Sequence, residues 1–219
     1  MLIVVTGMHR EALVVGQGGT VVVAGGSNAS LAGRIEAAAR GARAVLSIGI
    51  GGGLTRGLPA GVIVIARDVV WNDERFLADT RWRQDLAARL PDARTDTIAG
   101  SDGVVTTPAA KAALHRATGA ALVDMESHVA ARTAAACDLP FAALRVISDS
   151  ADRTLPPAAL VAIGPDGKLK LGAVLRSIAA RPGQIAGLIR TGRDNRRAMA
   201  SLGRCAALLG PGFACPYLG

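Results

Sequence analysis

Residues 122–152 read LVDMESHVAARTAAACDLPFAALRVISDSAD, and this stretch decides the fold. A short apolar run ends in acidic residues, and an Ala-rich segment of helical character follows. After Pro140 a second apolar run, 141–147, leads into Ser148 and Asp149. This order indicates a strand, helix, strand unit. Since a crossover of this length makes the two strands parallel, we expect their carboxyl ends on one edge of a sheet, where open α/β sheets bind ligands.

Glu126 and Asp149 follow these two strands, so the pattern predicts that both carboxylates face one cleft. An alternative stays open for each of them. Asp124, Glu126 and Ser127 are also typical of a helix start, where they complement the helix dipole, and Asp149 is a common turn residue. Two acidic strand ends on one rim favour a binding site over that alternative.

The composition is that of one reduced α/β domain. Its 219 residues, half of them hydrophobic, suffice for one substantial core and are few for two. Three cysteines and three histidines show no paired spacing, so neither a disulfide framework nor a metal site is expected. The amino terminus enters an apolar strand directly, and no apolar run approaches the ~18 residues of a membrane span. We therefore expect a cytoplasmic protein.

The net charge of +8 lies at one end of the chain. Residues 168–219 hold nine basic residues and one acidic residue, Asp194, which accounts for the whole excess. A basic segment with interleaved apolar residues is typical of a helix that lies on anionic lipid, at the inner face of a membrane. In the alternative, the apolar residues pack on the domain and the arginines are solvated. No nucleic-acid partner is expected, because the segment has no stacking aromatic before Phe213.

Apolar runs and their breakers predict an α/β fold with a mixed, largely parallel twisted sheet flanked by helices. Further strands are expected at 2–5, 20–24, 44–48, 62–70 and 97–100, and helices at 29–40, 79–90, 108–117, 169–180 and 184–209. Residues 8–11 are expected on a loop, and the last residues are expected to fray. We expect residues 1–180 to form the domain, with 181–219 as a basic helical extension packed on or beside it.

Two glycine-rich stretches follow predicted strands. The spacing in 49–53 is similar to a dinucleotide-binding fingerprint, but glycines and a proline in 57–61 interrupt the helix that such a site requires. A ligand that lies close to the backbone explains these glycines better. The turn with Gly26, Ser27 and Asn28 starts a helix and offers a weak cradle for an anion.

Five motifs give the chain a resemblance to a known superfamily. They are GMHREA at 7–12, SIGIGGGL at 47–54, GSDGVV at 100–105, VDMES at 123–127 and LRVISDSAD at 144–152. With them, the chain resembles the purine nucleoside phosphorylase and nucleosidase superfamily over about residues 2–180. It is most similar there to the methylthioadenosine and S-adenosylhomocysteine nucleosidases. The short segment after Glu11 and the tail RPGQIAGLIRTGRDN resemble their offshoot, the hopanoid-associated phosphorylases.

The resemblance implies roles for the matching residues. Asp149 would be the general acid that protonates the leaving purine at N7, which suits the oxocarbenium-like transition state of ribosyl C–N cleavage. Glu126 would hold the ribose hydroxyls, and Glu11 would activate an attacking water. The other residues implied to contact substrate are Met125, Ser148, Val104, Val105, Gly51 and Gly52. Arg145 and Asp102 also match, as supports of the loops. A homodimer is implied too, without cofactor or metal.

One departure bears on the nucleophile. Phosphorylases of this superfamily carry an Arg and a Ser where this chain has Ser47 and Ile50, so Gly26, Ser27 and Asn28 would have to contact phosphate instead. Our first hypothesis is still phosphorolysis of a C-linked adenosyl hopanoid lipid, with inorganic phosphate as co-substrate and adenine as product. In a variant, water cleaves methylthioadenosine or S-adenosylhomocysteine. From other classes, a non-catalytic nucleoside sensor and a nicotinamide-binding module stay as alternatives.

Overall fold

A computed structural model describes residues 1–16, 21–24, 27–160 and 171–218 of the chain. Gly26, one of the three residues expected to form an anion cradle, lies outside these ranges. No helix within them is long and apolar enough to cross a membrane.

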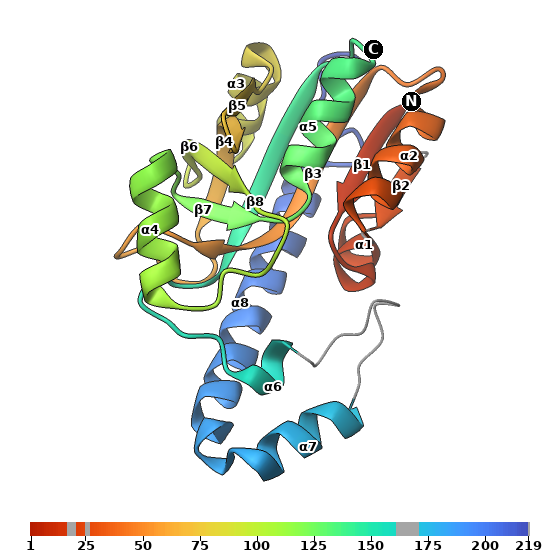
Figure 1. Cartoon of the computed structure of the whole chain (residues 1–219). Coiled ribbons are helices and arrows are strands. Elements are labelled where there is room, and N and C mark those ends of the chain that lie inside the picture. Colours follow the sequence, from red (N-terminus) through yellow and green to blue (C-terminus); the bar gives the residue numbers. More distant parts are fainter. Residues whose placement is uncertain (17–20, 25–26, 161–170, 219) are drawn as a thin grey trace.

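Strands and helices alternate through most of the chain (Figure 1). The strands are β1 (Leu2–Thr6), β2 (Val21–Ala24), β3 (Ala44–Gly53), β4 (Ile63–Trp71), β5 (Glu74–Leu77), β6 (Arg94–Gly100), β7 (Leu122–Asp124) and β8 (Phe141–Asp149). The helices are α1 (His9–Val15), α2 (Asn28–Ala39), α3 (Thr80–Arg89), α4 (Pro108–Thr118), α5 (Ser127–Ala136), α6 (Pro157–Leu160), α7 (Leu171–Ala180) and α8 (Ile185–Leu209), with the 3-10 turn η1 (Pro182–Gln184) before α8.

The strands form one mixed, largely parallel sheet, as the sequence predicts. Its order is β2-β1-β3-β7-β6-β4-β5, and β8 pairs with both β3 and β4. The pairs β1–β2, β1–β3, β3–β8, β4–β6 and β6–β7 are parallel, whereas β3–β7, β4–β5 and β4–β8 are antiparallel. Because β8 closes the path from β3 to β4, five strands (β3, β7, β6, β4 and β8) form a ring, with β1 and β2 on one side and β5 on the other.

The predicted parallel orientation of the two strands in 122–152 is wrong. β7 and β8 do not pair: β3 lies between them, antiparallel to β7 and parallel to β8. The reason is the glycine-rich run, which continues β3 to Gly53 and provides an edge for the three-residue β7. Gly52 is the register partner of Val123 on one side and of Asp149 on the other. The two acidic strand ends therefore do meet, across a shared glycine.

Helices cover both faces of the sheet, and each face has its own core. On one face α2 and the Ala-rich α5 pack on the strands through small and branched side chains such as Leu31, Ile35 and Ala130. On the other face α3 and the second half of α8 contribute Trp82 and Leu202. Alanine suits α5, because a helix without bulky side chains approaches the sheet closely.

The carboxyl-terminal segment is docked, so the prediction that it frays is wrong. Phe213 is buried in the core, and its carbonyl accepts a hydrogen bond from Trp82 Nε1 at 2.9 Å. Tyr217 donates its hydroxyl to Asp79 Oδ2 at 2.8 Å. An apolar ring with a polar tip suits such a position, where one end is buried and the other reaches a partner.

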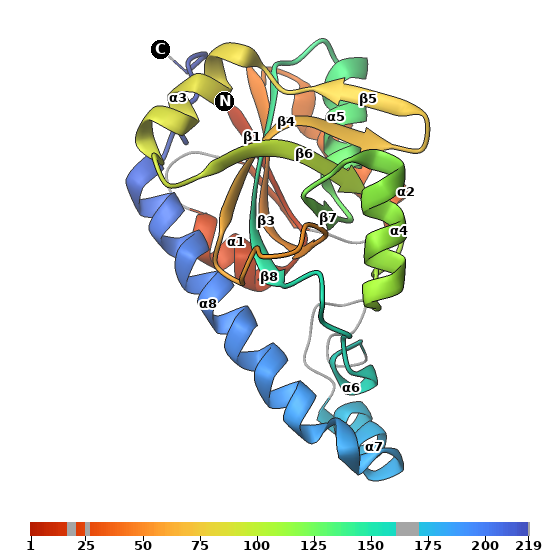
Figure 2. The same cartoon turned by 90° about the vertical axis from the view of Figure 1, so that its left-hand side faces the viewer.

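Helices α6 and α7 and the first half of α8 project from the body as an arm (Figures 1 and 2). We use the name arm for α6, α7, η1 and α8 up to Arg197, within the described residues. The second half of α8 differs, since Ala198, Leu202, Cys205 and Leu209 are buried beneath the sheet. One helix thus joins the arm to the core.

Candidate active site

Glu11 lies in a helix, not on the predicted loop. α1 begins at His9, directly after the turn that follows β1, and Glu11 occupies its first turn. Its Oε2 accepts hydrogen bonds from the backbone N–H of Gly7 and Met8, both at 2.8 Å, as in a capping box. Its Oε1 accepts from Ile50 N–H at 2.7 Å. Three backbone donors thus fix this buried carboxylate against the end of β1 and the glycine-rich half of β3.

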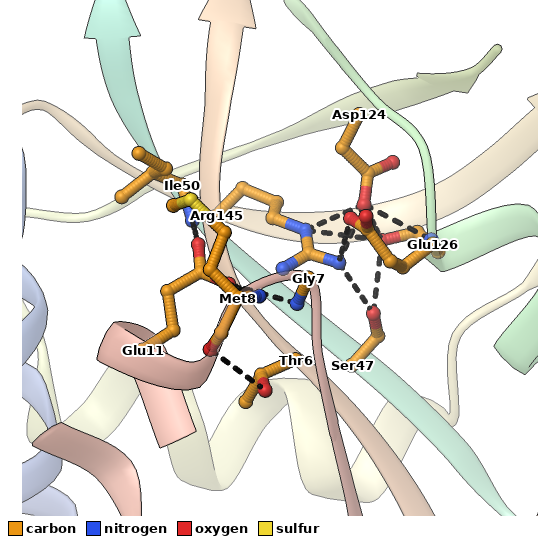
Figure 3. Close-up of polar contacts among 10 residues, drawn as sticks. Thr6, Gly7, Met8, Glu11, Ser47, Ile50, Asp124, Glu126 and Arg145 are labelled. Atoms are coloured by element: carbon orange, nitrogen blue, oxygen red, sulfur yellow. Dashed lines mark hydrogen bonds and ion pairs between the residues drawn. The ribbon is translucent and has the colours of Figure 1, made fainter. Parts of the chain in front are cut away.

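Arg145 lies at the centre of the site, among the acidic residues (Figure 3). It lies in β8 with no exposed surface. Its Nε and Nη2 donate to Asp124 Oδ2 at 2.6 and 2.5 Å, and Nη2 also donates to Ser47 Oγ at 2.7 Å. Nη2 lies 3.5 Å from Glu126 Oε2. Among the described residues, Nη1 lacks a hydrogen-bond partner, and it points into the space beside Glu11.

The sequence left open whether Asp124 and Glu126 stabilise a helix start or belong to a binding site, and the structure gives a different answer for each of them. Asp124 Oδ2 accepts from Ser127 N at 2.9 Å and from Ser127 Oγ at 2.7 Å, so Asp124 and Ser127 do stabilise the start of α5. Glu126 occupies the N-cap position, but its side chain makes no cap hydrogen bond. Its carboxylate turns toward Arg145 instead. The helix-start interpretation is therefore correct for Asp124 and wrong for Glu126.

Burial controls the charge of both glutamates. It raises the pKa of Glu126 to about 8, with the Arg145 guanidinium acting in the opposite direction and Asp124 and Glu11 adding to the rise. Burial likewise raises the pKa of Glu11, against the pull of Arg145 and of three backbone N–H groups. A single arginine is shared among several carboxylates, and Glu126 can therefore exchange a proton near neutral pH.

Two glycines make room for these side chains. A Cβ on Gly7 would lie 2.7 Å from Glu126 Oε1. A Cβ on Gly49 would lie 2.3 Å from Arg145 Nη1 and 2.7 Å from Glu11 Oε1. Contacts this short do not occur, so any larger residue would displace the carboxylates or the arginine. The packing of the site thus requires glycine at these two positions, Gly7 in GMHREA and Gly49 in SIGIGGGL.

Asp149 lies at the end of β8 with a partner that the sequence did not indicate. Its Oδ1 accepts from Ser148 Oγ at 2.7 Å, and its Oδ2 accepts from Lys111 Nζ. Lys111 comes from α4, and its side chain is fully buried. The one available signal is compositional: before residue 168 every other basic residue except histidine is an arginine.

The remaining predicted residues surround this centre unevenly. Val105 packs beside Leu54 and Val123, and Val104 is exposed. Met125 is half-buried between the two acidic residues, and Gly51 accepts from Ser148 Oγ at 3.0 Å through its carbonyl.

The two residues of the expected anion cradle that are described are already engaged. Ser27 Oγ caps α2 by accepting from Ser30 N at 3.3 Å, and Asn28 donates to Asp102 Oδ1 at 2.8 Å.

Two hollows border Asp149 and the loop that follows it. One, of about 240 Å³, is lined by Leu54, Arg56, Pro108, Ala112, Ala151 and Asp152. The other, of about 190 Å³, is lined by Asp149 itself and by Arg153, Gly187, Arg190, Thr191 and Asp194, among others. Within the described residues, no group of three histidine, cysteine or acidic side chains could hold a metal ion. Because the second hollow is lined by Asp149 and by residues of α8, the arm borders the site through α8.

Comparisons with known proteins define the class to which this chain belongs. A family model for the phosphorylase superfamily matches residues 3–180. The chain therefore belongs to the phosphorylase superfamily, and it is an enzyme of the nucleoside phosphorylase and nucleosidase class. The sequence matches no curated protein.

Solved structures share the fold at low sequence identity. The chain is similar to 5′-methylthioadenosine/S-adenosylhomocysteine nucleosidase from Neisseria meningitidis, with a TM-score of 0.70, 18% identity and coverage of 95% of this chain and 97% of the other. It is also similar to the Helicobacter pylori enzyme of the same name, with a TM-score of 0.68, 16% identity and coverage of 95% of each chain. Futalosine hydrolase of Helicobacter pylori has a TM-score of 0.61 and 17% identity, with coverage of 68% of this chain and 87% of the other.

Proposed function

We propose that this enzyme cleaves the N-glycosidic bond of an adenosyl compound and releases adenine. One observation carries the proposal: carboxylates from three separate segments gather around the glycine-rich half of β3. Glu11 accepts a hydrogen bond from Ile50 N–H, and the carboxylate of Asp149 lies beside Gly52. Glu126 forms an ion pair with Arg145. Ribosyl C–N cleavage needs an acid for the leaving purine and negative charge near the sugar, where positive charge develops. Asp149 and Glu126 are our candidates for these two tasks.

Each group has a part in that reaction. Asp149 protonates the purine at N7, with Ser148 orienting its carboxyl group. Glu126 accepts hydrogen bonds from the ribose hydroxyls, because an ionised carboxylate is an acceptor matched to two O–H donors. Met125 packs on the sugar. Val104, Val105, Gly51 and Gly52 form the surface on which the nucleoside lies.

The contacts favour water over phosphate as the nucleophile. Ser47 Oγ is buried and bonded to Arg145, and the N–H of Ile50 is taken by Glu11, so neither position offers a free donor to phosphate. Ser27 and Asn28 are engaged elsewhere. Nη1 of Arg145, which has no hydrogen-bond partner in the described part of the chain, lies beside Glu11 and suits one water molecule. We therefore revise the expected phosphorolysis and infer that Glu11 accepts a proton from water as the water attacks the sugar.

For the 5′ substituent we propose the C-linked lipid of an adenosylated hopanoid. The enzyme would bind this substrate at the surface of an anionic membrane. The arm supports this proposal, because Leu175, Ile185 and Ile189 are exposed on it together with Arg181 and Arg193. An exposed apolar and basic surface is typical of a helix that lies on anionic lipid. The cavity that α8 shares with Asp149 brings this surface next to the site.

The test is release of adenine from a panel of 5′-substituted adenosines, with and without phosphate. We expect adenine and a free sugar at equal rates in both buffers. Formation of a sugar 1-phosphate that requires phosphate would overturn water as the nucleophile. Tight adenine binding without turnover of any substrate would favour the non-catalytic sensor instead.

A further inference from the structure

A buried ion pair joins the acid of the proposed reaction to α4. Thr107 Oγ1 accepts from Ala110 N at 3.2 Å, Pro108 follows at the first helical position, and Gly119 ends α4 in the left-handed conformation with φ of 69°. These three features fix where the helix starts and stops. They hold Lys111, one turn into the helix, facing the loop after β8.

All donors of Lys111 and both oxygens of Asp149 are in use. Besides Asp149 Oδ2, Nζ donates to the carbonyls of Ser150 at 2.9 Å and Arg153 at 3.3 Å. Three acceptors around one nitrogen match the three N–H groups of an ammonium ion. Because its Oδ2 faces this ammonium ion, Asp149 is the carboxylate of an ion pair in this arrangement and carries no proton of its own for a purine.

An ion pair of this kind has a second form with the same proton content. If one proton moves from Nζ to Oδ2, the ammonium carboxylate becomes an amine beside a carboxylic acid. The Asp149 side chain is 10% exposed, and that of Lys111 has no exposed surface. A bound nucleoside would remove the remaining water, and desolvation disfavours two charges relative to the neutral form.

We propose that Lys111 is a positioning residue that stores the proton which Asp149 passes to the purine. This inference rests on the proposed function. As the sugar C–N bond breaks, its electron pair stays on the purine. N7 takes the proton of Asp149, a proton that came from Lys111 Nζ. The amine left on Lys111 regains a proton from solvent after adenine leaves. In the described structure, the other charged groups near the pair are Asp152 and Arg153 on the loop after β8, and Arg190 and Asp194 of α8, which line the same hollow as Asp149.

The alkaline limb of kcat against pH tests this in the wild-type enzyme. A shared proton is lost where ammonium groups lose theirs, at about pH 9 to 11, whereas a lone carboxylic acid loses its proton at about pH 4 to 6. We expect the limb in the upper range. A wild-type limb in the lower range overturns the proposal. Absence of adenine release at every pH contradicts the proposed function instead, so the two failures are distinct.

Two variants separate proton storage from charge. Lys111→Met should lower kcat at pH 8 by about 100-fold or more, the usual worth of a general acid, and should regain activity as the pH is lowered. Lys111→Arg keeps the charge but cannot give up a proton, so it should be equally slow at pH 8. Thermal unfolding checks that both fold. Wild-type kcat and an unchanged alkaline limb in Lys111→Arg would show that only charge matters and would overturn the proposal.

Discussion

Arg145 and two glycines explain how several acidic residues share one buried site. Unpaired buried carboxylates cost several kcal/mol each, so they gather where one guanidinium and oriented N–H groups can serve them together. Gly7 and Gly49 leave the space that Glu126 and Arg145 fill. The sequence singles out Glu126 and Asp149 because Glu126 follows the strand β7 closely and Asp149 ends β8. It cannot show Lys111, whose partner is 38 residues away and is reached only through the placement of α4.

Glu11→Gln tests the proposed base. The amide keeps nearly the same volume but cannot accept a proton from water, so kcat should fall by about 100- to 10,000-fold. Adenine affinity should change little, since the role proposed for Glu11 is at the nucleophile and not at the purine. Glu36→Gln, an exposed glutamate on α2, serves as the matched control and should keep wild-type kcat. Rates of adenine release at saturating substrate decide the matter; a Glu11→Gln enzyme within tenfold of wild type contradicts the role.

Glu126 should make stability depend on pH. Its pKa is raised from 4.5 to about 8, so between these values the folded protein binds more protons than the unfolded chain. Stability therefore falls as pH rises through this window, by up to about 1.4 kcal/mol per pH unit. Solvent at its side chain, which is 19% exposed, reduces that figure.

The measurement is Tm from pH 5 to pH 8 for wild type and Glu126→Gln. Since 1 kcal/mol corresponds to about 2–4 °C in a chain of this size, the wild-type decline should be visible and the variant's decline shallower. Glu11 shifts in the same direction and leaves a residual slope. Because the ribose clamp needs the ionised form, kcat/KM of the wild type should rise over the same window. Parallel Tm curves for the two proteins would argue against a titrating Glu126.

At the scale of elements, α8 has an exposed first half and a buried second half, and sequence periodicity cannot separate the two. The sequence predicts one basic amphipathic helix at 184–209 and leaves open whether it packs or binds lipid. The structure divides the helix: Leu202 and Leu209 are buried, and Ile185 and Ile189 are exposed. The relative direction of β7 and β8 is a similar case, because hydrophobic runs predict strands but not which strand lies between them.

The arm can be tested by charge reversal. Each surface cation contributes about 1 kcal/mol on anionic lipid, so Arg181→Glu with Arg193→Glu should weaken binding to phosphatidylserine vesicles at least about tenfold. The matched control reverses two exposed arginines of α3, Arg81 and Arg89. Deletion of α8 is unsuitable, because half of it is core. Co-sedimentation at low and high salt gives the answer, and equal sedimentation of all three proteins would exclude the arm as the contact.

At the scale of the whole molecule, the strand order is what brings the site together. Composition predicts one mixed α/β domain, and the five motifs predict its superfamily, which the family match confirms. The ring of five strands is not predictable in this way, since closure depends on β8 pairing with both β3 and β4. That double pairing places the ends of β1, β3, β7 and β8 around one centre, where the proposed acid and base lie.

The most direct test of glycosidic cleavage at this centre compares wild type with Asp149→Asn. Adenine release from the best substrate of the 5′-substituted panel is measured in phosphate-free buffer, with adenine binding by calorimetry as the check on the folded site. Asparagine keeps the size of Asp149 but has no carboxyl proton, so the account predicts a rate about 100- to 10,000-fold below wild type. An Asp149→Asn rate within tenfold of wild type would contradict it.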